Sequence, residues 1–361
     1  NIILPIGLSF YIFHAISYLI DIYRKEALPA RNLIDFSAFI ALFPHLVAGP
    51  VLRYHLLAEQ FHHRVHSWSN FSRGCTIFMV GFCKKVLIAD TVAPLADAAF
   101  AIKNPSMMDA WLGTIAYTIQ LFFDFSGYTD MAIGLALMIG FVFPQNFNDP
   151  YTSKSITEFW QRWHMSLSSW LREYLYIPLG GNKKGTRRTY INLFLTMLLG
   201  GLWHGANWTF VVWGAWHGGI LAIERYLKSK FGDSILPSWL RIIKTMLLVM
   251  IGWIFFRAID LNNALQMLRG LIGLNGFNFS NMMEWQIEPD RLGILFVAIF
   301  LVYAMPWLHR YRGGPMRYLL IPLFFWAVAT LSAQNFTPFL YFQFSNHIAQ
   351  LKAHLHVRDS S

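Results

Sequence analysis

Charged residues are scarce in this sequence, and acidic residues are the scarcer kind. Lysine, arginine, aspartate and glutamate together make up 13% of the 361 residues, whereas an ordinary soluble domain carries roughly 25%. Hydrophobic residues reach 55%, and the mean hydropathy is +0.41. So few charges cannot cover a globule with solvated groups, and we therefore expect much of the surface to face lipid.

Several signatures of other protein classes are missing as well. The two cysteines, Cys75 and Cys83, lie within or beside one apolar stretch and give no disulfide framework. The sequence contains no HExxH, no paired CxxC and no GxSxG motif. We therefore expect no metal site and no permanently bound cofactor. Because no internal repeat, low-complexity tract or flexible linker appears either, we expect one membrane-embedded domain over residues 1–361.

Apolar runs predict an all-α, multi-pass membrane protein, because a spanning helix needs about 20 mostly apolar residues. The clear candidate spans are residues 2–20, 190–203, 208–223, 242–256, 292–308 and 318–331. Residues 33–51 and 76–100 are interrupted by prolines or charges and are expected as re-entrant or broken helices. Residues 110–143 are too long for one span and are expected as two helices that meet at residues 125–127. The total is eight to eleven membrane segments.

The chain starts at Asn1 inside an apolar run, so we expect further amino-terminal spans to precede it. Its net charge of +10 would suggest nucleic acid in another protein. Here the basic residues sit between apolar runs instead of forming one stripe with exposed aromatic side chains, so nucleic-acid binding is not expected.

The basic connections also predict an orientation, because membrane proteins place them on the cytoplasmic side. Residues 180–188 contain Lys183, Lys184, Arg187 and Arg188 without an acidic residue. Basic clusters recur at residues 225–244 and at residues 310–317, which include Arg310 and Arg312, whereas residues 259–291 lack an excess of positive charge. The three basic connections, at residues 180–188, 225–244 and 310–317, are therefore expected on the cytoplasmic side. Residues 259–291 are expected on the outer side.

His204 is the foremost candidate for chemistry, because it lies between two apolar runs in the stretch GGLWHGANW at residues 200–208. Ionisable groups at bilayer depth are costly unless compensated, so they are functional candidates by default. Burial favours the neutral imidazole, which is the form that accepts the proton of a hydroxyl attacking a thioester. The flanking glycines would let backbone, helix or substrate approach closely. The alternative is a packed histidine bonded to a neighbouring carbonyl or hydroxyl.

The tryptophan-rich segment at residues 155–181 provides a second candidate, His164. Read as one helix, it places His164 on an apolar stripe, begins with a capping box of Ser155 and Glu158, and pairs Glu158 with Arg162. A helix lying at the membrane interface would explain the tryptophans. It would not explain a histidine on the apolar stripe.

Asp124 and Asp130 are weaker signals within apolar sequence. They are expected to pair with Arg162 or Arg172, or to support a polar pocket. The sequence does not distinguish a structural ion pair from a catalytic role for these two aspartates.

With these residues in view, the chain resembles the membrane-bound O-acyltransferase family, and specifically its bacterial alginate O-acetylase branch. The strongest blocks are FWQRWH at residues 159–164, WLREYLYIPLGG at residues 170–181 and GLWHGA at residues 201–206. Further matching blocks run from residues 4–11 through 122–132 to 338–344, so the resemblance covers essentially the whole chain.

The resemblance implies a ring of helices around a central funnel and a catalytic role for His204. His164 falls where many eukaryotic relatives carry an asparagine, so its role transfers less directly. Trp203 and Asn207, beside His204, are expected as supporting residues together with Asp124, Asp130 and Arg162. The expected reaction moves an acetyl group from cytoplasmic acetyl-CoA across the membrane to hydroxyls of an exported polysaccharide.

The expected location is the bacterial inner membrane, and the basic connection at residues 180–188 is expected to hold the phosphates of the donor. In bacterial relatives the acceptor is reached directly or through a periplasmic or membrane-anchored, esterase-like transferase. Two other classes stay open. One is a transporter whose pathway is lined by Asp124, Asp130 and His204, and the other is a non-catalytic subunit of a polysaccharide export complex that acts through outward connections such as residues 277–290.

Overall fold

The computed structural model describes residues 7–46, 49–308 and 316–333. Every regular element in these ranges is a helix, which confirms the expected all-α class. Arg310, Arg312 and the two blocks at residues 4–6 and 338–344 lie outside the described residues, so the expectations that rest on them stay predictions.

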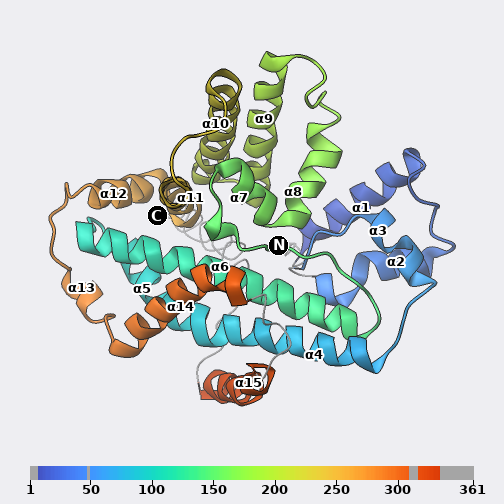
Figure 1. Ribbon diagram of the computed structural model, residues 1–361, viewed down its shortest axis with the longest axis horizontal. Helices are drawn as coiled ribbons and strands as arrows, with labels where there is room; N and C mark the ends of the chain where they lie inside the picture. Colours follow the sequence, from blue (N-terminus) through green and yellow to red (C-terminus); the bar gives the residue numbers. More distant parts are fainter. Residues whose placement is uncertain (1–6, 47–48, 309–315, 334–361) are drawn as a thin grey trace, which may run out of the picture.

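Long helical segments form the centre of the molecule, and Figure 1 shows them running alongside one another. α4 (Trp68–Cys83) continues through a π-helical turn, η3 (Lys84–Ala89), into α5 (Asp90–Ala101), and α6 (Met107–Met138) packs against all three. The interruption expected within residues 76–100 is therefore a widened helical turn at the two lysines, not a break in the chain.

α6 corrects the prediction of two helices within residues 110–143, because it is a single helix of 32 residues. Gly127 does not break it. Gly127 instead lies against Gly81 of α4, and Gly134 lies against Gly74, so that a Cβ at any of these four positions would collide with the partner's carbonyl oxygen. Small residues let two helices approach closely in this way. Gly127 is therefore a contact glycine between two helices and not the expected hinge.

The remaining helices surround this centre, as Figure 1 shows. α9 and α10 form a hairpin that projects from the central helices beside α11, and α15 packs on α4. The bounds of these helices and of their neighbours are α1 (Leu8–Tyr23), α2 (Leu33–Ala41), η1 (Phe43–His45), α3 (Tyr54–Leu57), η2 (Ala58–Phe61), α9 (Thr186–His204), α10 (Trp208–Phe231), α11 (Ser238–Arg257), α12 (Leu261–Leu271), α13 (Asn281–Glu284), α14 (Pro289–Leu308) and α15 (Met316–Ala333).

The segment at residues 155–181 departs from the single helix predicted for it. It forms α7 (Ile156–Arg162), α8 (Met165–Leu171) and the π-helical turn η5 (Arg172–Tyr176), and the break between α7 and α8 lies at Trp163 and His164. His164 adopts a left-handed backbone with φ 45° and ψ 53°, which non-glycine residues rarely adopt. The predicted stripe therefore does not run through His164, and the chain turns a corner there.

The start of α7 agrees in part with the predicted capping box. The Ser155 side chain accepts a hydrogen bond from the Glu158 backbone N–H, as expected. The Glu158 carboxylate does not reach back to Ser155 and accepts instead from the backbone N–H of Lys154, at 2.8 Å. The predicted pair between Glu158 and Arg162 is present, with 2.7 Å between the carboxylate and the guanidinium.

Two helices in the described part of the chain are long and apolar enough to cross a membrane, judged by length and composition. They are α11 and the part of α14 from Pro289 to Trp307. Shorter apolar helical stretches occur at Phe10–Tyr23, Leu33–His45 and Tyr318–Ala333. The count of eight to eleven membrane segments stays a prediction.

Candidate active site

His204 is the last residue of α9, at the turn that leads into α10. α9 ends there because Gly205 has an extended backbone, with φ 169° and ψ 156°. Asn207 then begins α10: its side chain accepts a hydrogen bond from the backbone N–H of Thr209 and donates one to the backbone oxygen of Ile259 at 2.9 Å. Asn207 thus holds the turn that carries His204.

Aromatic rings surround the His204 imidazole. Its ring centroid lies 4.8 Å from that of Trp203, 5.2 Å from that of Trp213 and 5.0 Å from that of Phe256. These contacts bury the Nδ1 atom, whereas the side chain as a whole is partly exposed. The imidazole is therefore held in an apolar frame without being sealed inside the described part of the chain.

His164 occupies the corner between α7 and α8 and is buried, with 3% of its surface exposed. Its ring meets Phe125 of α6 edge to face at 4.7 Å. Its Nδ1 atom lies 3.2 Å from the side-chain oxygen of Asn146. Its Nε2 atom is buried, and no hydrogen-bond partner for it exists among the described residues.

The structure brings the two predicted histidines into one neighbourhood. A continuous set of rings joins their surroundings: Trp163 lies 4.9 Å from Trp253, which lies 5.8 Å from Phe256, the ring beside His204. Both imidazoles thus border one aromatic cluster, and each can accept a proton in its neutral form.

The two aspartates predicted as supporting residues lie elsewhere. Asp124 pairs with Lys85 at 2.6 Å, and Asp130 pairs with Lys84 at 2.6 Å, so the expected partners Arg162 and Arg172 were wrong. Both lysines belong to the π-helical turn that packs on α6. These ion pairs join α6 to the π-helical turn η3. They explain why charged residues occur within these apolar segments.

The basic side chains predicted as donor contacts are far from His204 along α9. Lys183, Lys184, Arg187 and Arg188 are exposed and lie at or before the first turn of that helix, whereas His204 lies at its last residue. A helix of 19 residues is about 28 Å long. A donor held by this loop would therefore have to extend along α9 to reach the imidazole.

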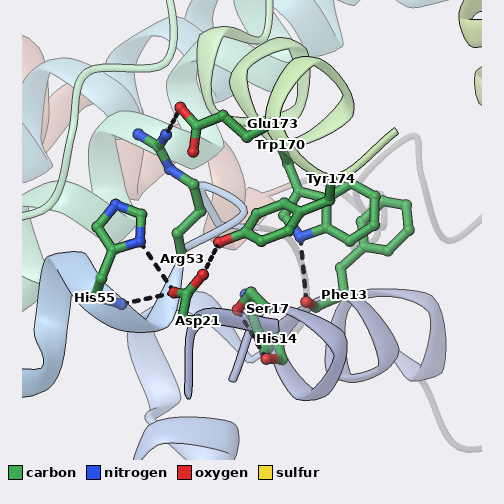
Figure 2. A network of polar contacts seen from close by, with 9 residues as sticks. All are labelled: Phe13, His14, Ser17, Asp21, Arg53, His55, Trp170, Glu173 and Tyr174. Atoms are coloured by element: carbon green, nitrogen blue, oxygen red, sulfur yellow. Dashed lines mark hydrogen bonds and ion pairs between the residues drawn. The ribbon is translucent and has the colours of Figure 1, made fainter. Parts of the chain in front are cut away.

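A polar network that sequence reasoning missed anchors the site segment to α1, as Figure 2 shows. Asp21 is fully buried and accepts hydrogen bonds from the Tyr174 hydroxyl and from both the backbone N–H and the Nδ1 of His55. Burial raises the pKa of the Tyr174 hydroxyl, and its hydrogen bond to Asp21 raises that pKa further. Arg53 and Glu173 form an ion pair beside this network.

Asp21, His55 and Glu26 also form a group in the described residues whose ligand atoms lie within 4.8 Å of one another, as a metal ion would need. Both oxygens of Asp21, however, already accept hydrogen bonds. These bonds already join α1, α3 and η5 through Asp21, His55 and Tyr174.

A cavity of about 200 Å³ lies between α6, α11 and α14, next to the aromatic cluster. Its lining is almost wholly apolar and includes neither His164 nor His204. Tyr151 forms its boundary with the site and stacks on Trp163 at 5.8 Å between ring centroids. The cavity is therefore adjacent to the histidines but does not contain them.

The sequence profile of the membrane-bound O-acyltransferase family matches residues 23–265. A probable alginate O-acetylase of Pseudomonas putida is 51% identical and one of Azotobacter vinelandii is 49% identical, each alignment covering 95% of this chain and 76% of the relative. A peptidoglycan O-acetyltransferase of Helicobacter pylori is 36% identical over 85% of this chain and 64% of its own length.

Proposed function

The chain belongs to the membrane-bound O-acyltransferase family and is an O-acetyltransferase, and from this premise we propose that it acetylates the hydroxyls of an exported polysaccharide of the alginate type. The observation that carries the proposal is the placement of His204 and His164 in one aromatic neighbourhood. The proposed acceptor is based on the names of two relatives. Both are named as probable alginate O-acetylases and are about half identical over 95% of this chain.

In the proposed reaction His204 acts as the general base. One ring nitrogen takes the proton from the attacking hydroxyl, and the hydroxyl oxygen forms a bond to the carbonyl carbon of an acetyl thioester. The carbon–sulfur bond then breaks, and the imidazolium gives the proton to the leaving thiolate, which departs as a thiol. The aromatic frame supports this role, because a neutral imidazole is the form that a weakly solvated site favours.

The proposed donor is acetyl-CoA on the cytoplasmic side of the bacterial inner membrane, which the multi-pass chain would cross as a ring of helices around a funnel. Lys183, Lys184, Arg187 and Arg188 are proposed to hold the donor's phosphates, since all four are exposed on one short segment. Their separation from His204 by the length of α9 requires the acetyl end of the donor to enter along that helix. A periplasmic or membrane-anchored, esterase-like partner is proposed to receive the acetyl group where transfer to the polysaccharide is not direct.

The test uses cells that lack the endogenous gene and produce the full-length protein or its His204→Ala variant. The expected result is loss of acetyl ester from the exported polysaccharide at equal membrane abundance. His62→Ala serves as the matched control, because His62 is exposed and lies outside the site. Normal acetylation by His204→Ala would remove the general-base assignment.

A further inference from the structure

Asn146 lies in the segment that joins α6 to α7, and it is 1% exposed. Its backbone oxygen accepts a hydrogen bond from the N–H of Met165 at 2.9 Å, and its side-chain oxygen accepts one from the N–H of Ser166 at 3.2 Å. These are the first two N–H groups of α8, whose own N-cap, His164, makes no side-chain cap. Asn146 therefore caps α8 from another part of the chain.

These contacts fix which way the Asn146 amide faces. A backbone N–H can only donate, so the atom that faces Ser166 must be the amide oxygen Oδ1. The Ser166 hydroxyl adds a second bond to the same oxygen, at 2.8 Å. Ser166 Oγ in turn accepts from the backbone N–H of Val51 at 2.9 Å, and its single proton points to Asn146 Oδ1, the acceptor at 2.8 Å.

The orientation of the amide then decides the tautomer of His164. Nδ1 of His164 lies 3.2 Å from Asn146 Oδ1, which is an acceptor without a proton. Nδ1 must therefore be the ring nitrogen that carries the proton. The other polar atom near Nδ1, Ser166 Oγ at 3.5 Å, has already given its proton to Asn146 and cannot donate to the ring. In the neutral imidazole the lone pair is thus left on Nε2.

We propose that Asn146 is a positioning residue that fixes His164 as the Nδ1–H tautomer, so that Nε2 faces the site as a hydrogen-bond acceptor for a substrate hydroxyl. Nε2 is buried and has no hydrogen-bond partner among the described residues, so its lone pair is available to an added donor. The strained left-handed backbone of His164 is held by the same Asn146 contacts. The assignment of a substrate hydroxyl rests on the proposed function, whereas the tautomer does not.

The first test reads the tautomer without turnover. The protein is labelled with ¹⁵N-histidine, placed in bilayers and measured by solid-state NMR, and the His164 signals are identified by their loss in His164→Gln. The expected spectrum has a protonated Nδ1 and an unprotonated Nε2. In Asn146→Leu this preference should disappear, and in Asn146→Asp, which keeps an acceptor oxygen, it should persist. A protonated Nε2 in the unaltered protein would overturn the proposal.

The second test is kinetic and uses acetyl transfer from acetyl-CoA by the purified protein in bilayers. Asn146→Leu should lower kcat by about 10- to 100-fold, the range found when the hydrogen-bond partner that orients a metal-ligating histidine is removed, with the KM for acetyl-CoA unchanged. Asn146→Asp should recover most of the rate. Asn148→Leu is the matched control, because it makes the same change two residues away at an exposed position.

The outcomes separate the inference from the proposed function. Equal loss of rate in Asn146→Leu and Asn146→Asp, with the His164 tautomer intact in both, would overturn the positioning role. Normal acetylation by His164→Gln would overturn the substrate contact. Under either of these two outcomes, loss of acetylation in His204→Ala would still support the proposed reaction.

Discussion

Phe13 of α1 stacks on Trp203, the residue before His204, with 4.9 Å between ring centroids and 14° between ring planes. Phe13 also stacks on Trp170 of α8, with 4.1 Å between ring centroids. Trp170 also donates a hydrogen bond from its indole nitrogen to the Phe13 backbone oxygen, at 3.2 Å. One ring of the first described helix thus joins the end of α9, which carries His204, to the helix that begins beside His164.

The first prediction concerns this stack. Phe13→Ala should destabilise the protein by about 3–5 kcal/mol, the usual cost of removing a buried phenylalanine, and should lower acetyl transfer because Trp203 loses its support. Thermal unfolding in detergent and acetyl transfer measure the two effects. Tyr23→Ala on the same helix is the control, since Tyr23 is 88% exposed. An equal effect of both changes would refute a specific role for the stack.

The second prediction concerns the crossing of α4 and α6. Gly127→Ala places a methyl group against the carbonyl oxygen of Gly81, so it should destabilise the protein by about 1–3 kcal/mol. Gly219→Ala in α10 is the matched control, because nothing lies within 4 Å of its added Cβ. That control should leave stability unchanged or raise it by up to about 1 kcal/mol through helix propensity. The denaturation midpoints of both variants, compared with that of the unaltered protein, measure these changes.

The third prediction separates a structural from a catalytic role for Asp124. Lys85 lies within 2.7 Å of both Asp90 and Asp124, and all three side chains are largely buried. Lys85→Met leaves buried carboxylates unpaired and should cost about 3–5 kcal/mol. The double variant Lys85→Met with Asp124→Asn should recover part of that stability and retain normal turnover per folded molecule. Loss of turnover in a stably folded Asp124→Asn protein would instead point to chemistry.

The fourth prediction concerns the hydrogen bond from Tyr174 to Asp21. Tyr174→Phe removes one donor from a fully buried carboxylate, so it should cost about 1–3 kcal/mol. Because burial and Asp21 raise the pKa of Tyr174 in the folded protein, this contribution is present in full below the unfolded pKa of about 10 and is lost progressively as pH rises above that value towards the raised folded pKa. Stability curves of both proteins across pH 6–11 test this. Tyr226→Phe, at an exposed position, should show no such difference.

The fifth prediction concerns the donor contacts. Neutralising Lys183, Lys184, Arg187 and Arg188 together should raise the KM for acetyl-CoA by about tenfold or more, because the phosphates lose charge-assisted contacts, with little change in kcat. Neutralising Lys228 and Lys230, exposed at the end of α10, is the control on the same side of the helix hairpin. An unchanged KM in the first variant would show that the phosphates bind elsewhere.

Local patterns in the sequence predicted local structure well. Each of the runs at residues 190–203, 208–223 and 242–256 lies within one helix of the structure. The cap from Ser155 and the pair of Glu158 with Arg162 were also correct, since both join residues within one helical turn. The errors at α6 and at His164 share a cause. A glycine can be a hinge or a contact between helices, and a helical stripe can continue or break, depending on the neighbours in the fold.

The partners of the site residues could not be predicted from these patterns. Asn146 in a proline-containing connection looks like any surface loop residue, although it caps α8 and orients His164. Asp124 was assigned to an arginine further along the chain, whereas its partner, Lys85, precedes it by 39 positions. No sequence periodicity records such a pairing, because each depends on how whole helices pack.

By itself the sequence determined that this chain is helical, that much of its surface is apolar, and that His204 and His164 stand out from their apolar surroundings. These properties follow from composition and from spacing within one or two helical turns, where covalent geometry sets which side chains are neighbours. Only the tertiary structure decided that Phe13 stacks on Trp203 and that the Asn146 side chain contacts the His164 imidazole. Residues distant in sequence meet only when close packing brings their helices together, and that packing depends on the shapes of all the side chains at once.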